Sequence, residues 1–409
     1  MHGGMFDLAS ALRYVIAHEG SDLHLKVPSR PLVRIHGQLD PIPDSEPLGP
    51  EDTQRILHEV LTAPDRLAEF DREREVDFSF EVEGLARFRV NAFQQRGLTS
   101  VVMRAVPQRI KTIEELALPP VIRTLAEEER GIVLLTGTTG SGKSTTLAAM
   151  IDHINSTMSK HIVTIEDPIE FIHSDRRSVI NQREVGLDTA SFKRALRRVL
   201  RQDPDVILIG EMRDEETVQT ALSAAETGHL VLSTIHTVNA TESINRILDF
   251  FPPHQEKQAR AMVAGTMKGI VSQRLVPTPD GDGRVAVCEV LTMTGRARDM
   301  ILDAEQTGRL ADIIGEGRYY GMQTFDQALL EHLTGGRIDM EQALRAATSP
   351  NDFKLLVASR GMRASSMDTV APEAVAPEGP ASSVAAPEDP QAEYARKAEA
   401  KRAGIALLR

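Results

Sequence analysis

One short stretch of the sequence restricts the fold more than any other. Residues 132–135 read Ile-Val-Leu-Leu, and residues 137–144 read Gly-Thr-Thr-Gly-Ser-Gly-Lys-Ser. An uninterrupted apolar run is typical of a strand buried on both faces. The glycines permit a tight turn after it, and the residues from Lys143 onward are suited to a helix. The stretch therefore predicts a strand–loop–helix unit of a parallel sheet.

Three further apolar runs have the same character. They are Ile-Val-Thr-Ile at 162–165, Val-Ile-Leu-Ile at 206–209 and Leu-Val-Leu-Ser at 230–233. Helix-like stretches rich in Ala and Leu separate them. Because this alternation is typical of a parallel sheet covered on both faces, the predicted fold class is α/β.

The rest of the chain has other patterns. Alternating apolar and polar residues around Leu23, Val76 and Phe88 predict a small α+β domain whose sheet has one packed face and one arginine-bearing face. After Gly295 the spacing is helical, and the C-terminal residues are mainly Ala, Pro, Glu and Ser. The predicted parts are an N-terminal domain at 1–106, a linker at 107–130, an α/β domain at 131–294, a helical region at 295–360 and a disordered tail at 361–409.

The pattern Gly-x-x-x-x-Gly-Lys-Ser between a strand and a helix is a phosphate-binding loop. Its backbone N–H groups turn inward around phosphate oxygens, and the helix N-terminus adds partial positive charge. We expect Lys143 to reach the β- and γ-phosphates and Ser144 to bind Mg²⁺. The predicted activity is ATP hydrolysis, with ATP and Mg²⁺ as cofactors. The nucleotide-binding residues predicted here are Gly137, Thr138, Thr139, Gly140, Ser141, Gly142, Lys143, Ser144 and Thr145.

A carboxylate cluster follows the run at 162–165. It contains Glu166, Asp167 and Glu170 and lies at the carboxyl end of a predicted strand, where ligands of parallel sheets bind. Such a cluster can orient or deprotonate the water that attacks the γ-phosphate. We assign Glu170 as the general base, supported by Glu166 and Asp167. The alternative is a solvated acidic turn.

A second acidic position ends the run at 206–209. A Walker B strand normally carries an Asp for magnesium, but here that position is Gly210 and the next residue is Glu211. Glu211 is therefore predicted to bind the metal through water and to act at the catalytic centre.

Two histidines flank the last apolar run, His229 before it and His236 after it. We predict that both lie at the mouth of the nucleotide site, with His236 sensing the γ-phosphate. The alternative is an ordinary packed or exposed histidine in either place.

Arginines often stabilise phosphoryl transfer from a second domain or subunit. Four candidates lie in the N-terminal domain, and we prefer Arg89 and Arg104. The alternative is that these side chains form a solvated charged face. The other candidates are Arg87, Arg96, Lys193, Arg197 and Arg201.

Composition argues against several classes of protein. The net charge of -12 disfavours a nucleic-acid partner, because nucleic-acid binders use Lys and Arg to neutralise phosphates. No apolar run is long enough to insert directly into a membrane, and the N-terminus lacks a secretory signal. The single Cys288 can form neither an intrachain disulfide nor a cysteine zinc cage. A cytoplasmic location is expected.

These boxes together resemble the secretion ATPase superfamily, in particular the twitching-motility ATPases of the PilT and PilU type that retract type IV pili. The likeness covers residues 21 to about 357 and includes Ser-Asp-Leu-His-Leu at 21–25, Ala-Arg-Phe-Arg-Val at 86–90, Gly-Glu-Met-Arg-Asp at 210–214 and Ala-Glu-Thr-Gly-His at 225–229. Arg-Glu-Val-Gly-Leu-Asp-Thr at 183–189 and Gly-Met-Gln-Thr-Phe-Asp at 321–326 make it look closer to PilU.

The resemblance implies a RecA-like P-loop ATPase domain preceded by a small PAS-like domain. It further implies a homohexamer, with ATP between the N-terminal domain of one subunit and the ATPase domain of the next. The implied partner is the inner-membrane platform protein at the pilus base, so the protein would be peripheral to that membrane. The implied function is a motor that powers or supports pilus retraction and twitching motility.

Several alternatives stay open. PilT carries an Ala-Ile-Arg-Asn-Leu motif where this chain reads Gly-Arg-Ala-Arg-Asp-Met-Ile at 295–301. This difference favours a second hypothesis, an accessory subunit that depends on a PilT-type paralogue. A type II secretion or DNA-uptake ATPase and a nucleic-acid motor are further alternatives.

Overall fold

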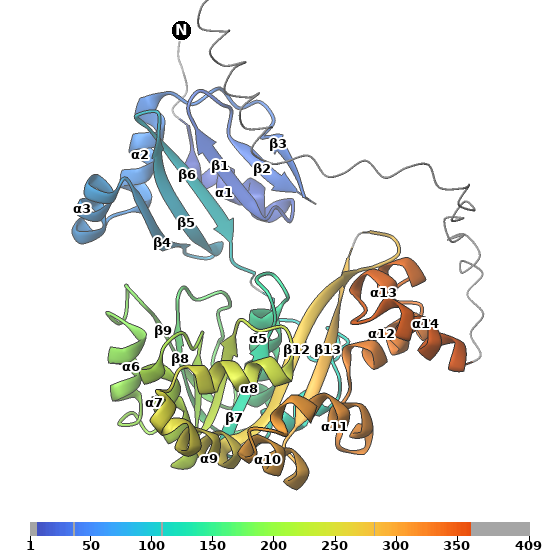
Figure 1. Cartoon of the computed structure of the whole chain (residues 1–409). Helices are drawn as coiled ribbons and strands as arrows, with labels where there is room; N and C mark the ends of the chain where they lie inside the picture. The colour runs from blue at the N-terminus through green and yellow to red at the C-terminus, as the bar shows by residue number, and fades with distance from the viewer. Residues whose placement is uncertain (1–5, 36, 108, 282, 361–409) are drawn as a thin grey trace, which may run out of the picture. The chain divides into compact units, whose positions relative to one another are not determined.

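The computed structural model describes residues 6–35, 37–107, 109–281 and 283–360. The tail predicted at 361–409 lies outside the described residues. Figure 1 shows the arrangement of helices and strands. The predicted boundaries between the parts of the chain stay predictions.

The N-terminal residues form a six-stranded antiparallel sheet with strand order β3-β2-β1-β6-β5-β4 (Figure 1). In β5, Phe88, Val90 and Ala92 are fully buried and alternate with more exposed polar residues, as their spacing predicts. The helices of this part cover the apolar face and share one core with it. The elements are α1 (Leu8–Ala17), β1 (Asp22–Lys26), β2 (Leu32–Ile35), β3 (Gln38–Pro41), α2 (Pro50–Val60), α3 (Pro64–Glu73), β4 (Glu75–Val82), β5 (Ala86–Gln95) and β6 (Leu98–Ala105).

A seven-stranded sheet follows, with strand order β13-β12-β7-β11-β10-β8-β9. All neighbouring strands are parallel except β12 and β13, which form an antiparallel pair. The four apolar runs are β7, β8, β10 and β11, so the α/β prediction is confirmed. The strands are β7 (Gly131–Thr136), β8 (His161–Glu166), β9 (Val179–Glu184), β10 (Val206–Ile209), β11 (Leu230–Ile235), β12 (Met267–Pro277) and β13 (Arg284–Thr292).

Helices cover both faces of this sheet because its strands are apolar on both sides. In β7, Ile132 and Leu134 pack into the core formed with α6 to α11, whereas Val133 and Leu135 pack into the core formed with α4 and α5. The helices up to α9 are α4 (Val121–Ala126), α5 (Lys143–Thr157), α6 (Phe192–Val199), α7 (Glu215–Glu226), α8 (Ala240–Asp249) and α9 (Glu256–Thr266).

Three strands of the large sheet, β9, β12 and β13, are not among the four predicted apolar runs. The edge strand β9 reads Val-Ile-Asn-Gln-Arg-Glu, and polar side chains interrupt the apolar pattern of β12 as well. β12 and β13 extend the sheet beyond the parallel strands and carry a separate core with the last helices.

The region after Gly295 is helical, as its spacing predicts. It contains α10 (Gly295–Leu302), α11 (Leu310–Glu316), α12 (Phe325–Thr334), α13 (Met340–Ala346) and α14 (Pro350–Ser359). Short 3-10 turns occur at Pro253–Gln255, Thr307–Arg309 and Arg318–Tyr320. In the described part of the chain, no helix is both long and apolar enough to cross a bilayer.

Candidate nucleotide-binding site

The glycine-rich loop connects the end of β7 at Thr136 to the start of α5 at Lys143. Gly137, Gly140 and Gly142 have φ angles of +141°, +78° and +89°, which residues with a Cβ rarely adopt. A Cβ on Gly137 would come within 2.5 Å of the Gln273 carbonyl oxygen. The loop therefore requires glycine for its backbone angles and for its close packing against β12.

Lys143 lies inside the loop and is 8% exposed. Its Nζ donates to the carbonyl oxygens of Gly137 at 2.8 Å and of Thr138 at 3.0 Å. Burial lowers the pKa of Lys143, while the nearby carboxylates of Glu211 and Glu170 oppose that shift. The amino group thus lies at the loop, within electrostatic reach of both acidic positions.

The loop opens on a cleft of about 600 Å³ at the carboxyl ends of the parallel strands. Most predicted site residues line this cleft, including Glu170. The predicted residues at its wall are Arg89, Arg104, Thr139, Gly140, Ser141, Gly142, Lys143, Ser144, Thr145, Glu166, Asp167, Glu170, Glu211 and His236. Gly137 and Thr138 are absent from this wall, and their carbonyl groups contact Lys143 instead.

Glu166 ends β8 and has fixed partners. Its Oε1 accepts from the Thr164 hydroxyl at 2.7 Å and from Gln182 Nε2 at 3.2 Å. Burial raises the pKa of Glu166, and these two hydrogen bonds only partly offset the effect. Glu170 is exposed within the same cleft. The two carboxylates therefore have different environments, with Glu166 enclosed and Glu170 open to the cleft.

Glu211 follows β10 and contacts two side chains of the cleft. Arg213 Nη2 lies 2.8 Å from Glu211 Oε2, and His236 Nε2 lies 3.4 Å from Oε1. The hydrogen bond from Arg213 places a guanidinium, absent from the predicted site, beside this carboxylate. The prediction that His236 lies at the mouth of the site is consistent with this geometry.

His229 lies elsewhere, and its predicted position at the mouth of the cleft is wrong. In the parallel pairing of β11 with β7, Leu230 is opposite Gly131, whereas Ile235 is opposite Thr136, next to the loop. His229 thus lies at the amino end of β11, opposite to the end where the loop begins, and its Nδ1 contacts the Ala224 carbonyl oxygen at 2.9 Å. Its place before a parallel strand was the signal that could have excluded it.

Arg89 and Arg104 are opposite each other on β5 and β6, and both line the cleft. Arg104 Nε also donates to Asp22 Oδ1 at 2.8 Å, and the Asp22 side chain is only 6% exposed. The same chain supplies both arginines together with the glycine-rich loop. The expectation of a neighbouring subunit's arginine stays a prediction.

Some residues of the site have no motif that reveals them. Gln273 of β12 donates its Nε2 to the Ser141 carbonyl oxygen at 2.8 Å and accepts from the Thr146 hydroxyl at 2.8 Å. Arg284, at the start of β13, lines the cleft. Both come from the antiparallel pair that the apolar pattern does not predict.

Several known proteins are similar to this chain in sequence. Residues 72–345 match the family model described as type II/IV secretion system protein. The chain is 44% identical over 346 residues to the type IV pilus ATPase PilU of Pseudomonas aeruginosa, which covers 85% of this chain and 90% of that protein. It is 42% identical over 347 residues to the pilus retraction ATPase PilT of the same organism, covering 85% of this chain and 100% of PilT.

Solved structures of related ATPases are also similar to this chain. The crystal structure of the pilus retraction motor PilT with bound ADP aligns with a TM-score of 0.79 and 42% identity, over 86% of this chain and 99% of that chain. The ATPase DotB of Legionella pneumophila aligns with a TM-score of 0.70 and 25% identity, over 88% of this chain and 98% of that chain. The chain therefore belongs to the type II/IV secretion system protein family, and it is an ATPase of the kind represented by PilT and PilU.

Proposed function

We propose that this protein is a hexameric ATP-hydrolysing motor that powers or supports type IV pilus retraction and twitching motility. The observation that carries the proposal is the cleft, which combines a phosphate-binding loop, carboxylates from two strands, His236 and several arginines, among them Arg89 and Arg104. The similarity to PilT and PilU over most of the chain supports the choice of pilus retraction. The preference for PilU over PilT stays a prediction, because the two identities are close.

In this proposal the loop binds ATP through its backbone amides and Lys143. Arg89 and Arg104 approach the phosphates from β5 and β6. Ser144 and Glu211 would hold Mg²⁺, which supplies charge neutralisation at the phosphates when bound. No group of three His, Cys, Asp or Glu side chains suited to a metal occurs among the described residues.

We propose the following roles for the acidic residues in hydrolysis. Glu170 faces the cleft and takes a proton from the attacking water, so that the new oxygen–phosphorus bond forms as the bond to ADP breaks. Glu166 is already occupied by Thr164 and Gln182, and we assign it a supporting role. His236 senses the γ-phosphate from its contact with Glu211. Lys143 and the arginines stabilise the negative charge that develops on the transferred group.

The proposed assembly is a homohexamer in the cytoplasm, peripheral at the inner-membrane base of the pilus machine. Its proposed partner is the platform protein of that machine, and a PilT-type paralogue can share the ring's task. We expect no nucleic-acid partner, because the net charge is -12.

The proposal is tested with purified protein. We expect magnesium-dependent ATP hydrolysis that Lys143→Ala abolishes, because the loop then lacks its phosphate-binding charge. Glu170→Gln should lower kcat by about 10²-fold or more while ADP still binds, since an amide cannot accept the proton. The matched control is Glu83→Gln, an exposed carboxylate of the N-terminal part. Hydrolysis that survives Lys143→Ala would refute the motor.

The accessory-subunit hypothesis is the second candidate. The observation that favours it is the sequence of α10 (Gly295–Leu302), which differs from the Ala-Ile-Arg-Asn-Leu motif expected of PilT. A retraction assay in cells without a PilT-type paralogue distinguishes the accessory subunit from the independent motor. Retraction driven by this protein alone excludes the accessory role, and its absence despite active hydrolysis excludes an independent motor.

A further inference from the structure

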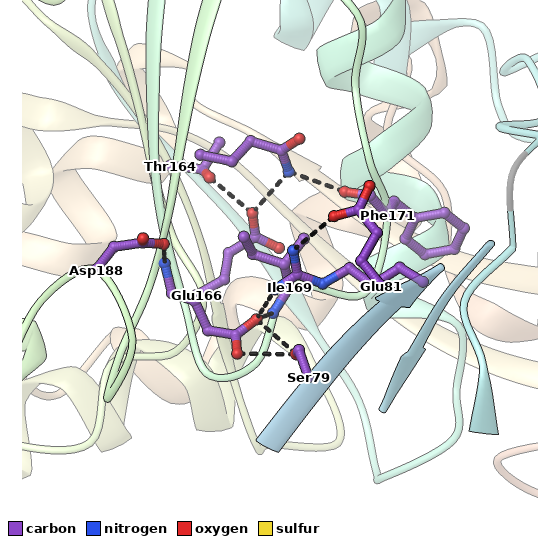
Figure 2. A network of polar contacts seen from close by, with 10 residues as sticks. Ser79, Glu81, Thr164, Glu166, Ile169, Phe171 and Asp188 are labelled. Atoms are coloured by element: carbon purple, nitrogen blue, oxygen red, sulfur yellow. Dashed lines mark hydrogen bonds and ion pairs between the residues drawn. The ribbon is translucent and has the colours of Figure 1, made fainter. Parts of the chain in front are cut away.

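The loop that carries Glu170 is held by side chains of β9, the edge strand of the large sheet. Gln182 Nε2 donates to the Phe171 carbonyl oxygen at 2.8 Å, and Gln182 Oε1 accepts from the His173 backbone N–H at 2.8 Å. The same amide reaches Glu166 (Figure 2). Gln182 therefore fixes the part of the loop that follows Glu170.

The residue before Glu170 is held by Glu184, two positions further along β9 on the same face. The Ile169 backbone N–H donates to Glu184 Oε2 at 3.1 Å. The other donors to this carboxylate come from the N-terminal sheet: Ser79 Oγ at 2.8 Å from Oε1 and Arg87 Nη2 at 2.7 Å from Oε2. Figure 2 shows Ser79 and Ile169 directed at the same carboxylate. One side chain thus connects β4 and β5 to the catalytic loop.

Both side chains of this connection, Glu184 and Arg87, are largely buried. Glu184 is 4% exposed, and the Arg87 side chain is 14% exposed. The other acidic side chain near Arg87, Glu81, is 3.9 Å away and 69% exposed, so it cannot replace a buried partner. If the N-terminal sheet moved away, Glu184 would lose Ser79 and Arg87 and keep only the Ile169 amide among these three donors. While the sheet is docked, the pairing with Arg87 is needed, because an unpaired buried charge is strongly unfavourable.

A second contact lies beside the first. Gly186, just after β9, has a φ of +88°, and a Cβ at this position would collide with the guanidinium of Arg66 in α3. The N-terminal part therefore packs closely against both the end of β9 and the turn that follows it.

We propose that Glu184 and Arg87 are positioning residues that make the shape of the Glu170 loop depend on docking of the N-terminal sheet. When the sheet is docked, Glu184 is neutralised by Arg87 and holds the Ile169 amide, which fixes the backbone next to Glu170. When the sheet is undocked, the carboxylate turns toward water and releases that amide. The inference rests on the proposed role of Glu170, and it gives the N-terminal sheet a second task besides supplying Arg89 and Arg104.

The test is a double-mutant cycle in the full-length protein, with Arg87→Ala, Glu184→Gln and the double variant. Each single variant should lower kcat for ATP hydrolysis by about tenfold to a hundredfold, because a small displacement of a catalytic group has effects of that size. ADP affinity should change little, since the phosphate-binding loop is intact. The double variant should resemble the single ones, because all three break the same link. Arg87→Lys, which keeps the charge, should recover part of the loss.

Glu81→Gln is the matched control, because it removes the exposed carboxylate on the other side of Arg87 and leaves the Arg87–Glu184 pair in place. Its kcat should equal that of the wild type. Unchanged kcat in both single variants, or losses that multiply in the double variant, would overturn the proposal.

Hydrogen exchange gives a readout that does not need hydrolysis. The Ile169 amide should exchange faster in Arg87→Ala at an unchanged melting temperature, whereas Glu81→Gln should leave it protected. If Glu184→Gln does not fold, Ser79→Ala replaces it and should show the same faster exchange. An equally protected Ile169 amide in Arg87→Ala refutes the link. Full activity of Glu170→Gln instead refutes the proposed base, and the exchange result then still decides whether Glu184 holds the loop.

Discussion

The side chain of Gln273, which belongs to β12, connects the phosphate-binding loop to the helix that follows the loop. It contacts Ser141 in the loop and Thr146 in the first turn of α5, and all three side chains are buried. A Cβ at Gly142 would approach Gln273 Nε2 to 2.7 Å, so the glycine is required for this contact as well. A single amide thus bridges the loop and the first turn of α5.

We therefore predict that Gln273→Ala lowers both stability and nucleotide affinity. The change leaves the Ser141 carbonyl group and the Thr146 hydroxyl without their partner, and such a loss costs about 1–3 kcal/mol in a buried place. Urea unfolding and ATP titration measure the two effects. Gln258→Ala, on the exposed side of α9, is the control. Normal ATP affinity in Gln273→Ala would show that the loop keeps its shape without this side chain.

The C-terminal helices depend on a different kind of buried polar group. His332 lies on the inner face of α12, is 6% exposed, and packs near the core that Phe325, Leu329 and Phe353 form with β12 and β13. Burial lowers the pKa of His332 from 6.5 to about 4, and Arg337 acts in the same direction. The helix therefore docks with a neutral imidazole.

This shift predicts an acid-sensitive contribution to stability. The folded pKa lies below the unfolded value, so the contribution is fully present above pH 6.5 and is lost as the pH falls toward 4. The loss is on the order of 3 kcal/mol for a shift of this size. Urea unfolding between pH 7 and 4 should show a flatter pH dependence for His332→Gln than for the wild type. His254→Gln, an exposed histidine, should keep the wild-type slope. Parallel slopes for all three proteins would contradict the prediction.

The cleft is a property of the whole described molecule, because two sheets contribute to its wall. The large sheet supplies the loop and the carboxylates, and β5 and β6 supply Arg89 and Arg104. Arg104 also holds the buried carboxylate of Asp22, whereas Arg89 is exposed and forms no ion pair within the described ranges. Substitution of Arg89 therefore tests the contribution of the N-terminal sheet to ATP binding without breaking a buried ion pair.

Arg89→Ala should weaken ATP binding or slow hydrolysis by about tenfold to a hundredfold, the value of one charge-assisted hydrogen bond to phosphate. ADP binding should be affected less if Arg89 reaches the γ-phosphate. Steady-state kinetics with ATP and ADP competition measure both, and Arg72→Ala, on the exposed side of α3, is the control. Wild-type kinetics of Arg89→Ala would remove this arginine from the site.

The sequence by itself determined the strand–loop–helix unit at 131–157, the four apolar strands and the acidic residues that end β8 and β10. These are local features, since glycine angles, apolar runs and the polarity of a parallel sheet are encoded within a few neighbouring residues. Tertiary structure decided the rest. Gln273 and Glu184 act through partners more than ninety residues away. Contacts of this kind arise from packing between distant segments, which no local pattern records.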